Sequence, residues 1–356
     1  MFYAVIMAGG SGTRMWPYSR QDHPKQALKI VGDRSMFQYA VERIASVFPS
    51  ERIFVVTRAR HAPILMDQMP ELPDKNFILE PEGRGTAPAI GLAAIHLLHK
   101  DPDASMAILT ADHYILNVER FCQVLTAAKR CATDGSMVTL GIQPTSASTG
   151  FGYIKQGSSL GEKNGFTYYA VQEFIEKPDS ATALQMVVSG NYSWNSGMFI
   201  WQVNRIMEEF EHQMPEFIAQ LTTVRAALGT PDYQLVLEQV WPEVENQSID
   251  YGIMEGAHQV IVLPVDIGWT DIGSWGSLFE ILPPDEYQNV AVGQHIGINT
   301  RRSLVLANKR LVATLGVEDL IIVNTDDALL VCSRDCEQDV KAIVDQLKIE
   351  RKTNFV

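Results

Sequence analysis

The sequence lacks several features that would each point to a particular class of protein. No run approaches the ~18 apolar residues of a membrane span, so we expect no membrane segment. Four cysteines in 356 residues are too few for a disulfide framework, and Cys332 and Cys336 lack the second ligand pair of a structural zinc site. The N-terminus has no basic segment before its apolar residues, so we expect no signal peptide. These absences predict a cytoplasmic protein with reduced thiols.

Positive charge is also scarce. The formal net charge is −13, whereas a nucleic-acid groove requires clustered Lys and Arg, so we expect no nucleic-acid partner. Hydrophobic residues make up 46% of the chain and charged residues 20%, which is ordinary for a globular protein with a real core. A small anionic ligand still fits this composition if a few cations gather in one place.

Short apolar segments alternate with longer amphipathic ones through the first two-thirds of the chain. This alternation predicts a Rossmann-like α/β fold whose mostly parallel sheet is flanked by helices. The predicted strands are 3–8, 52–57, 105–110, 137–142, 169–175, 197–203 and 260–266. One predicted helix begins after Ser35, which can form a capping box with Gln38. The other predicted helices cover 87–100, 119–133 and 180–189. Ligands of such sheets bind beyond the carboxyl ends of the strands.

The pattern changes after Pro283 and Pro284. Short strand-like pieces follow, separated by glycine or asparagine, and then one amphipathic helix that includes Val340 and Val344. We therefore predict a large domain over 1–285 and a small β-rich domain with a terminal helix over 286–356. The sequence does not fix the oligomeric state, and an apolar β-rich tail of this kind could serve a homodimer contact.

A glycine-rich turn follows the first predicted strand, in residues 8–17 (AGGSGTRMWP). Successive backbone N–H groups in such a turn can approach an anion closely. The turn is not a Walker A loop, because Gly-Thr-Arg stands where Gly-Lys-Ser/Thr is required, and Met15 replaces the third glycine of a dinucleotide fingerprint. Four cations lie in or just after it: Arg14, Arg20, Lys25 and Lys29. Backbone amides and nearby cations together predict a triphosphate site.

The turn, with Ser19-Arg20 and Pro24-Lys25-Gln26 after it, resembles the activation motif of the sugar nucleotidyltransferase family, and within it the mannose-1-phosphate guanylyltransferase branch. The resemblance covers nearly all of residues 1–285 and is weaker beyond. It implies a nucleotidyltransferase (GT-A-like) domain followed by a left-handed β-helix-like domain. It also implies that Arg14 and Lys25 hold the triphosphate and stabilise charge during transfer. The nucleotide-binding positions that it implies are Ala8, Gly9, Gly10, Gly12, Thr13, Glu80, Gly85, Thr86 and Ala87.

Glu80 begins the segment 80–90 (EPEGRGTAPAI), which follows a strand and opens a helix. Thr86 is a candidate helix cap there, which is a purely structural alternative for that residue. Guanine presents N1–H and an N2 amino group on one edge, and a carboxylate accepts hydrogen bonds from both. Glu80 therefore predicts selection of guanine over bases that present acceptors at that edge.

Two carboxylates follow apolar strands far apart in the sequence. Asp112 stands in 109–113 (LTADH), where capping of the next segment is an alternative role, and Asp271 stands in 266–275 (DIGWTDIGSW). Mg²⁺ binds few carboxylates and completes its octahedron with phosphate oxygens and water, so one aspartate from each segment suits it. Both segments also resemble the family's metal-ligand segments, which implies Asp112 and Asp271 as Mg²⁺ ligands.

Three further segments resemble the family's sugar-phosphate site: 151–154, 173–178 and 192–199. The likeness implies that Gly152, Glu176 and Asn195 contact the sugar and that Lys177 contacts its phosphate. Taken alone, Glu176 and Lys177 also read as a solvated ion pair before a proline. Residues 248–255 (SIDYGIME) predict an amphipathic helix with a serine cap.

The expected activity is transfer of GMP from GTP to α-D-mannose 1-phosphate, giving GDP-mannose and pyrophosphate with Mg²⁺ as cofactor. The same chemistry on another base or sugar, and a non-catalytic nucleotide-sugar-binding regulatory homologue, remain alternatives. A dehydrogenase is disfavoured by the missing third glycine. With 356 residues there is no room for the isomerase domain of some relatives, so we expect no phosphomannose isomerase activity.

Overall fold

The computed structural model describes residues 1–10 and 12–356, so Ser11 of the glycine-rich turn lies outside the described residues. These residues form two compact units. Unit 1 consists of Met1–Gly9, Ala40–Ala111 and Ile115–Trp269, and unit 2 consists of Gly10–Tyr39, Asp112–Tyr114 and Thr270–Val356. The short helix α1 (Met36–Glu42) and the paired short strands β5 (His113–Ile115) and β11 (Trp269–Asp271) are each divided by the unit boundary.

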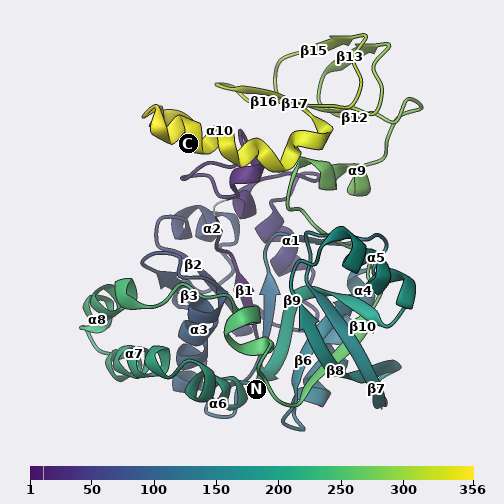
Figure 1. Ribbon diagram of the computed structural model, residues 1–356. Helices are drawn as coiled ribbons and strands as arrows, with labels where there is room; N and C mark the ends of the chain where they lie inside the picture. The colour runs from purple at the N-terminus through teal and green to yellow at the C-terminus, as the bar shows by residue number, and fades with distance from the viewer. Residues whose placement is uncertain (11) are drawn as a thin grey trace. The chain divides into compact units, whose positions relative to one another are not determined.

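Unit 1 is built on a nine-stranded sheet with the order β3-β2-β1-β4-β9-β6-β10-β8-β7 (Figure 1). Its strands are β1 (Phe2–Met7), β2 (Ile53–Arg58), β3 (Phe77–Glu80), β4 (Ser105–Thr110), β6 (Met137–Ile142), β7 (Tyr153–Lys163), β8 (Phe166–Ile175), β9 (Tyr192–Gln202) and β10 (Val260–Val265). The pairs β1–β2, β1–β4, β2–β3 and β6–β10 are parallel. Since β9 is antiparallel to both β4 and β6, and β8 to both β10 and β7, only β8 and β9 oppose the other seven strands. The predicted mostly parallel sheet is confirmed.

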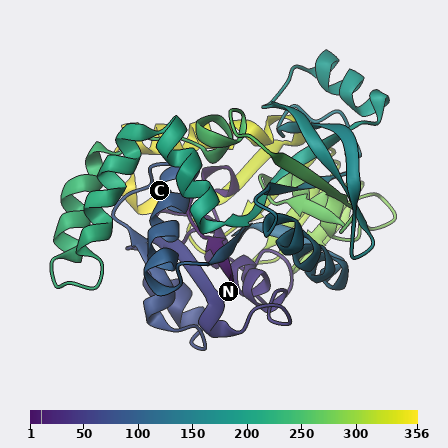
Figure 2. The same ribbon diagram turned by 90° about the horizontal axis from the view of Figure 1, so that it is seen from below.

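Helices cover both faces of this sheet because its strands are apolar on both sides. Tyr3 and Val5 pack in one core cluster with residues of α3, α6 and α7. These three helices also pack on one another (Figures 1 and 2). Phe2 points to the opposite face, where its ring lies against Phe48 and under the ammonium of Lys129 in α4. The helices of unit 1 are α2 (Ala62–Gln68), α3 (Thr86–Lys100), α4 (Val118–Ala132), α5 (Ser180–Ser189), α6 (Val203–Gln213), α7 (Pro215–Ala227) and α8 (Tyr233–Val240).

Local sequence signals account for several element ends. The Ser35 hydroxyl accepts from the Gln38 backbone N–H (3.1 Å) and the Gln38 side chain accepts from the Ser35 N–H (2.9 Å), so the predicted capping box is present. The cap predicted at Thr86 is wrong. Gly85 occupies the N-cap of α3, and the Thr86 hydroxyl accepts instead from the backbone N–H of Ile249 (2.8 Å).

Unit 2 contains a small β-rich body with a terminal helix, as predicted. Successive segments add strands alternately to two sheets, β12-β14-β16-β17 and β13-β15, whose pairs are parallel except for β16–β17. This coiled, β-helix-like arrangement is confirmed, whereas its left-handed sense stays a prediction. The elements are β12 (Val290–Val292), β13 (His295–Ile298), β14 (Leu304–Ala307), β15 (Val312–Leu315), β16 (Leu320–Asn324), β17 (Leu329–Ser333), α9 (Leu278–Ile281) and α10 (Val340–Ile349).

One hydrophobic cluster holds unit 2 together. It joins Met15 and Trp16, next to the glycine-rich turn, to Leu304 and Ile321 of the β-rich body and to Val344 of α10. The predicted boundary between residues 285 and 286 stays a prediction. No helix of the described chain is long and apolar enough to cross a membrane.

Candidate active site

The glycine-rich turn requires glycine at position 12. Gly12 has φ +56°, in the left-handed region, and it precedes a short 3-10 helix over Thr13–Met15. A Cβ on Gly12 would lie within 2.8 Å of the Lys25 Cβ, so only a bare residue lets this segment approach so closely. In unit 2 the turn is therefore shaped around Lys25.

Lys25 is directed at Asp112. It begins a 3-10 helix (Lys25–Ala27), its side chain is only 7% exposed, and its Nζ lies 2.9 Å from Asp112 Oδ2. Burial alone would raise the pKa of Asp112, but the charges of Lys25 and His113 lower it below its ordinary value. Asp112 therefore carries a negative charge with Lys25 as its counterion, rather than serving only as a cap.

Asp271 lies beside this ion pair. The Ile272 N–H donates to the Asp112 carbonyl (3.4 Å), and the Gly273 N–H donates to Asp271 Oδ1 (3.0 Å). Burial raises the pKa of Asp271, the charges of Lys25 and Arg14 lower it in part, and the charge of Asp112 adds to the rise. The structure thus brings together Arg14, Lys25, Asp112 and Asp271, the four residues predicted to do the chemistry.

Two adjacent carboxylates of this kind suit a hard divalent cation. Burial is the largest cause of the raised pKa of Asp271, and the charges of Lys25 and Arg14 lower that pKa only in part. Among residues 1–10 and 12–356 no group of three or more His, Cys, Asp or Glu side chains is placed to hold a metal. Mg²⁺ does not require one, because phosphate and water oxygens supply its remaining ligands. The carboxylates of Asp112 and Asp271 therefore fit Mg²⁺ better than they fit Zn²⁺.

In unit 1 the predicted base-reading residue lies at the carboxyl end of β3. Glu80 is 4% exposed, and a Cβ on Gly9, after β1, would lie 3.9 Å from its Oε2. Its Oε1 is buried without a hydrogen-bond partner among the described residues. Burial raises the pKa of Glu80 to about 7, against the lowering effect of Arg58. An acceptor that is buried but unsatisfied is the feature expected of a ligand contact.

The other residues of unit 1 that are predicted to bind the nucleotide make backbone contacts within the protein. Ala8 follows β1, and its N–H donates to Val56 O (2.8 Å). The Ala87 N–H donates to Gln247 O (3.1 Å), and Gly85 also lies against that carbonyl. In unit 2, Gly10 ends the first described range of the chain and Thr13 begins the 3-10 helix after the turn. The nucleotide-binding roles of these residues stay predictions.

The predicted sugar residues come together in unit 1. A Cβ on Gly152 would collide with Glu176 Oε2, so the absence of a side chain leaves the space that this carboxylate occupies. The Asn195 N–H donates to Gly152 O (2.8 Å), and Lys177 Nζ lies 3.4 Å from Glu176 Oε1. The Lys177 side chain is largely exposed, so its ammonium is accessible to an anion.

Sequence reasoning gave no role to a fifth residue of this cluster, Asp250. Its Oδ1 accepts from Asn195 Nδ2 (2.7 Å), and Asn195 Oδ1 accepts from the Gly197 N–H (3.1 Å), so the amide has one fixed orientation. Burial, with the nearby charge of Glu176, raises the pKa of Asp250. The segment 248–255 forms a short π-helix over Asp250–Met254, and the Tyr251 N–H donates to the Ser248 hydroxyl (3.3 Å), as the predicted serine cap requires. Nothing in its pattern signals a carboxylate beside Asn195.

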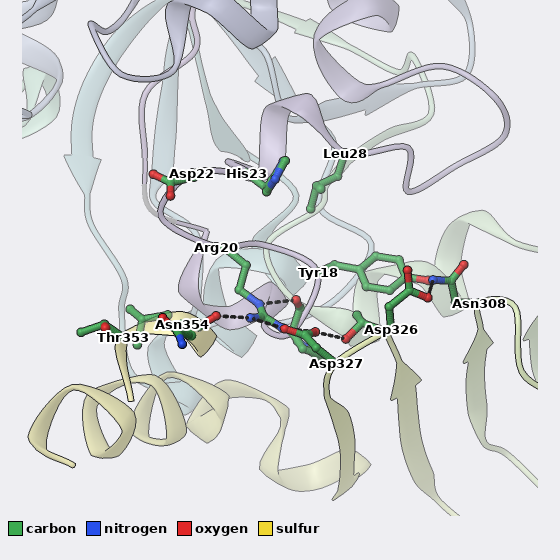
Figure 3. A pocket seen from close by; sticks show the side chains of 13 residues that line it. Tyr18, Arg20, Asp22, His23, Leu28, Asn308, Asp326, Asp327, Thr353 and Asn354 are labelled. Atoms are coloured by element: carbon green, nitrogen blue, oxygen red, sulfur yellow. Dashed lines mark hydrogen bonds and ion pairs between the residues drawn. The ribbon is translucent and has the colours of Figure 1, made fainter. Parts of the chain in front are cut away.

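Arg20, one of the cations near the turn, has protein partners of its own. It lies in unit 2 beside a pocket of about 740 Å³ lined also by Tyr18, His23 and Asn308 (Figure 3). Its guanidinium binds both carboxylate oxygens of Asp327, at 3.1 and 2.8 Å. Arg20 thus anchors the segment after the turn to the β-rich body.

Comparisons with known proteins identify the family of the chain. The family described as "Nucleotidyl transferase" matches residues 3–287, and the "MannoseP isomerase/GMP-like beta-helix domain" matches residues 293–347. Mannose-1-phosphate guanylyltransferase of Salmonella montevideo is 40% identical over 360 residues, which cover 100% of this chain and 76% of that protein. The enzyme of the same name from Klebsiella pneumoniae is 38% identical over 358 residues, with the same coverage.

A solved structure resembles the whole chain. The crystal structure described as mannose-1-phosphate geranyltransferase from Thermus thermophilus aligns with a TM-score of 0.88 and 32% identity, over 98% of this chain and 99% of that one. The sequence profile, the relatives and the fold agree. The chain therefore belongs to the nucleotidyl transferase family and groups within it with the mannose-1-phosphate guanylyltransferases.

Proposed function

We propose that this chain transfers GMP from GTP to mannose 1-phosphate, the activity named in its curated relatives, by in-line attack at the α-phosphorus. A phosphate oxygen of the sugar phosphate forms the new bond to that phosphorus. The bond from the α-phosphorus to the bridging oxygen breaks, and pyrophosphate leaves with the electron pair. Because the nucleophile is already an anion, no general base is needed, and the protein contributes positioning and charge.

The observation that carries this proposal is the Lys25–Asp112 pair beside Asp271. Lys25 and Arg14 would offset negative charge on the phosphates of GTP as the leaving group departs. Asp112 and Asp271 would hold Mg²⁺, which when bound supplies further positive charge to the phosphates.

Substrate choice would depend on residues of unit 1. Glu80 would accept from the N1–H and N2 amino groups of guanine, which accounts for its unsatisfied Oε1. Gly152, Glu176 and Asn195 would contact the hydroxyl groups of mannose, and the exposed Lys177 its phosphate. The Glu80 contact would favour GTP over other nucleotides, and the sugar contacts would orient mannose 1-phosphate for attack.

A substrate screen tests the proposal. Pyrophosphate release is measured with four nucleoside triphosphates and the 1-phosphates of mannose, glucose and galactose, with and without Mg²⁺. We expect turnover with GTP, mannose 1-phosphate and Mg²⁺ together. Turnover with another base or sugar would reassign the substrate, and no turnover with any pair would favour a non-catalytic nucleotide-sugar sensor.

Location and assembly complete the proposal. We place the chain in the cytoplasm, because Cys122, Cys131, Cys332 and Cys336 are all free thiols. A homodimer is supported by exposed apolar side chains on β13 and β15 in unit 2, including Ile296, Ile298 and Leu315. Light scattering of the purified chain measures this state, and a monomer at micromolar concentration would argue against the dimer.

A further inference from the structure

A line of hydrogen bonds in unit 2 runs from Arg14 to the Asp271 loop through two residues of the β-rich C-terminal body. Arg14 Nη1 donates to Gln338 Oε1 (3.1 Å). Gln338 Nε2 donates to Glu337 Oε1 (3.3 Å), which also accepts from the Ser274 hydroxyl (3.0 Å). Ser274 lies three residues after Asp271, whose Oδ1 accepts from the intervening Gly273 N–H. Residues 337 and 338 therefore contact both the predicted catalytic arginine and a loop that would hold Mg²⁺.

Glu337 is closely fitted to that loop. A Cβ on Gly276 would approach Glu337 Oε1 and Cδ to 2.7 Å, so position 276 must lack a side chain for this carboxylate to sit where it does. The other oxygen, Oε2, is buried without a hydrogen-bond partner among the described residues. A buried acceptor without a partner is unfavourable, and the Ser274 contact offsets this only in part. The fit is thus specific, and it is not explained by the stability of the β-rich body alone.

A second contact holds the far end of the same catalytic segment. Besides its two bonds to Asp327, Arg20 donates from Nε to Pro17 O (2.8 Å) and from Nη1 to Asn354 O (3.3 Å), and its side chain is only 13% exposed (Figure 3). Bidentate arginine–carboxylate pairs fix orientation as well as distance. Arg20 therefore fixes the position of the segment 12–20 relative to Asp327.

The residues between Arg14 and Arg20 are also held in place, because they are buried in the core of unit 2. Met15 and Trp16 belong to the same core cluster as Leu304 and Val340, and Trp275 Nε1 donates to Trp16 O (3.0 Å). A glycine-rich turn samples many conformations unless its neighbours restrict it. Restriction before the substrate binds lowers the entropy lost on reaching the reactive geometry. The segment 12–20 is restricted in this way at both ends and in its middle.

We propose that Asp327, Glu337 and Gln338 are positioning residues for nucleotidyl transfer, through which the C-terminal body holds Arg14, the segment 12–20 and the Asp271 loop in reactive geometry. The inference rests on the roles of Arg14 and Asp271 proposed above. The three residues act through Arg14, Arg20 and Ser274 and are not assigned any contact with substrate.

Matched variants of the full chain test the inference. Asp327→Asn is compared with Asp326→Asn, because Asp326 is the adjacent carboxylate but contacts Asn308 and Lys309 instead of Arg20. Gln338→Ala is compared with Gln346→Ala, because Gln346 donates to Glu350 at the end of its own helix. For each variant kcat, both KM values, the melting temperature and amide hydrogen exchange over residues 12–20 are measured.

We expect Asp327→Asn and Gln338→Ala to lower kcat by about 10- to 100-fold, the cost of small misplacements at a reacting centre. Their KM for mannose 1-phosphate should stay unchanged and exchange over 12–20 should become faster, whereas both controls should match the wild type. Asp327→Glu should recover most of the lost kcat, because it retains a bidentate acceptor. Gln338 is exposed, so its variant keeps the test valid even if Asp327→Asn folds poorly.

The outcomes separate this inference from the proposed function. Wild-type kcat in both Asp327→Asn and Gln338→Ala, while Arg14→Ala is impaired, would overturn the positioning role and leave the site assignment standing. Full turnover in Arg14→Ala would overturn the site assignment itself. Equal losses of kcat in the variants and their controls would also contradict the inference, because they would reflect general destabilisation.

Discussion

Among single residues, Lys25 has the most direct link to the proposed chemistry. Its buried ammonium contacts Asp112, and its charge acts to lower the pKa of both Asp112 and Asp271. Lys25→Met should lower kcat by about 10²–10³-fold, the usual cost of removing one preorganised charge. Steady-state assays at saturating GTP measure this, with Lys75→Met as the exposed control. Near-full turnover in Lys25→Met with unchanged folding would remove Lys25 from the mechanism.

Glu80 predicts a pH dependence of GTP binding. Burial raises the pKa of its carboxyl to about 7, and only the ionised form accepts from both guanine donors. The KM for GTP should therefore rise as pH falls below 7, by up to about 10-fold per pH unit. A KM that stays level between pH 8 and pH 5.5 would contradict this role. Glu80→Gln should have a weaker affinity for GTP that does not change with pH.

The same residue predicts an effect on stability, with a sign that follows from linkage. Because the folded-state pKa of Glu80 exceeds its ordinary value of 4.5, the folded protein binds more protons than the unfolded chain between about pH 4.5 and pH 7. The contribution of this carboxyl to the free energy of unfolding therefore falls as pH rises through that window. Glu80→Gln should be more stable than the wild type at pH 8, and the difference should shrink towards pH 4.5, as denaturant unfolding measures.

At the scale of elements, the loop before β7 and the strand β9 position the residues predicted to bind the sugar, which include Gly152 and Asn195. Gly152→Ala would place a methyl group where the Glu176 carboxylate lies, so Glu176 must move. We expect the KM for mannose 1-phosphate to rise at least about 10-fold, equivalent to losing one hydrogen bond to a charged group, while the KM for GTP is unchanged. Gly150→Ala is the control, since its Cβ would meet only Ser148 Oγ at an ordinary 3.6 Å. Equal effects of both substitutions would reject this reading of Gly152.

Element prediction from the sequence succeeded where burial produces a regular pattern. The strand 105–110 and the helix 180–189 with Gly190 after it match β4 and α5, because both have clear apolar periods and end signals. The strand β7 (Tyr153–Lys163) escaped prediction, because its second half is exposed and polar and so has no apolar alternation. Thr86 was misassigned as a cap because its partner, Ile249, lies 163 residues away in the chain.

At the scale of the whole molecule, the predicted catalytic residues could be named from motifs, but their surroundings could not. Lys25 and Asp112 were each predicted from a separate motif, and the structure places them in contact. The contacts of Arg14 with Gln338 and of Arg20 with Asp327 join residues more than 300 positions apart. Gln338 and Asp327 carry no local pattern that distinguishes them from other surface side chains. A single sequence therefore indicates candidate catalytic residues more readily than it indicates the residues that hold them in place.

The shared core of unit 2 predicts that the β-rich body and the segment 12–20 unfold together. Leu304 is fully buried in the cluster that contains Met15 and Trp16, so Leu304→Ala should lower the free energy of unfolding by about 2–5 kcal/mol. The exposed Leu329 is the control, and Leu329→Ala should change it by less than about 0.5 kcal/mol. Hydrogen exchange should show residues 12–20 losing protection together with residues 304–323 in Leu304→Ala. Loss in 304–323 alone would contradict a shared core.

The most direct test of the central claim measures how GDP-mannose formation depends on Mg²⁺ in Asp271→Asn, with Asp266→Asn as the neighbouring control. Asp266 is exposed and accepts from the Gly268 N–H, so its variant should behave as the wild type. If Asp112 and Asp271 hold the metal, Asp271→Asn should require at least about 10-fold more Mg²⁺ for half-maximal rate and should turn over far more slowly at saturation. Unchanged Mg²⁺ dependence and kcat in Asp271→Asn would contradict the account.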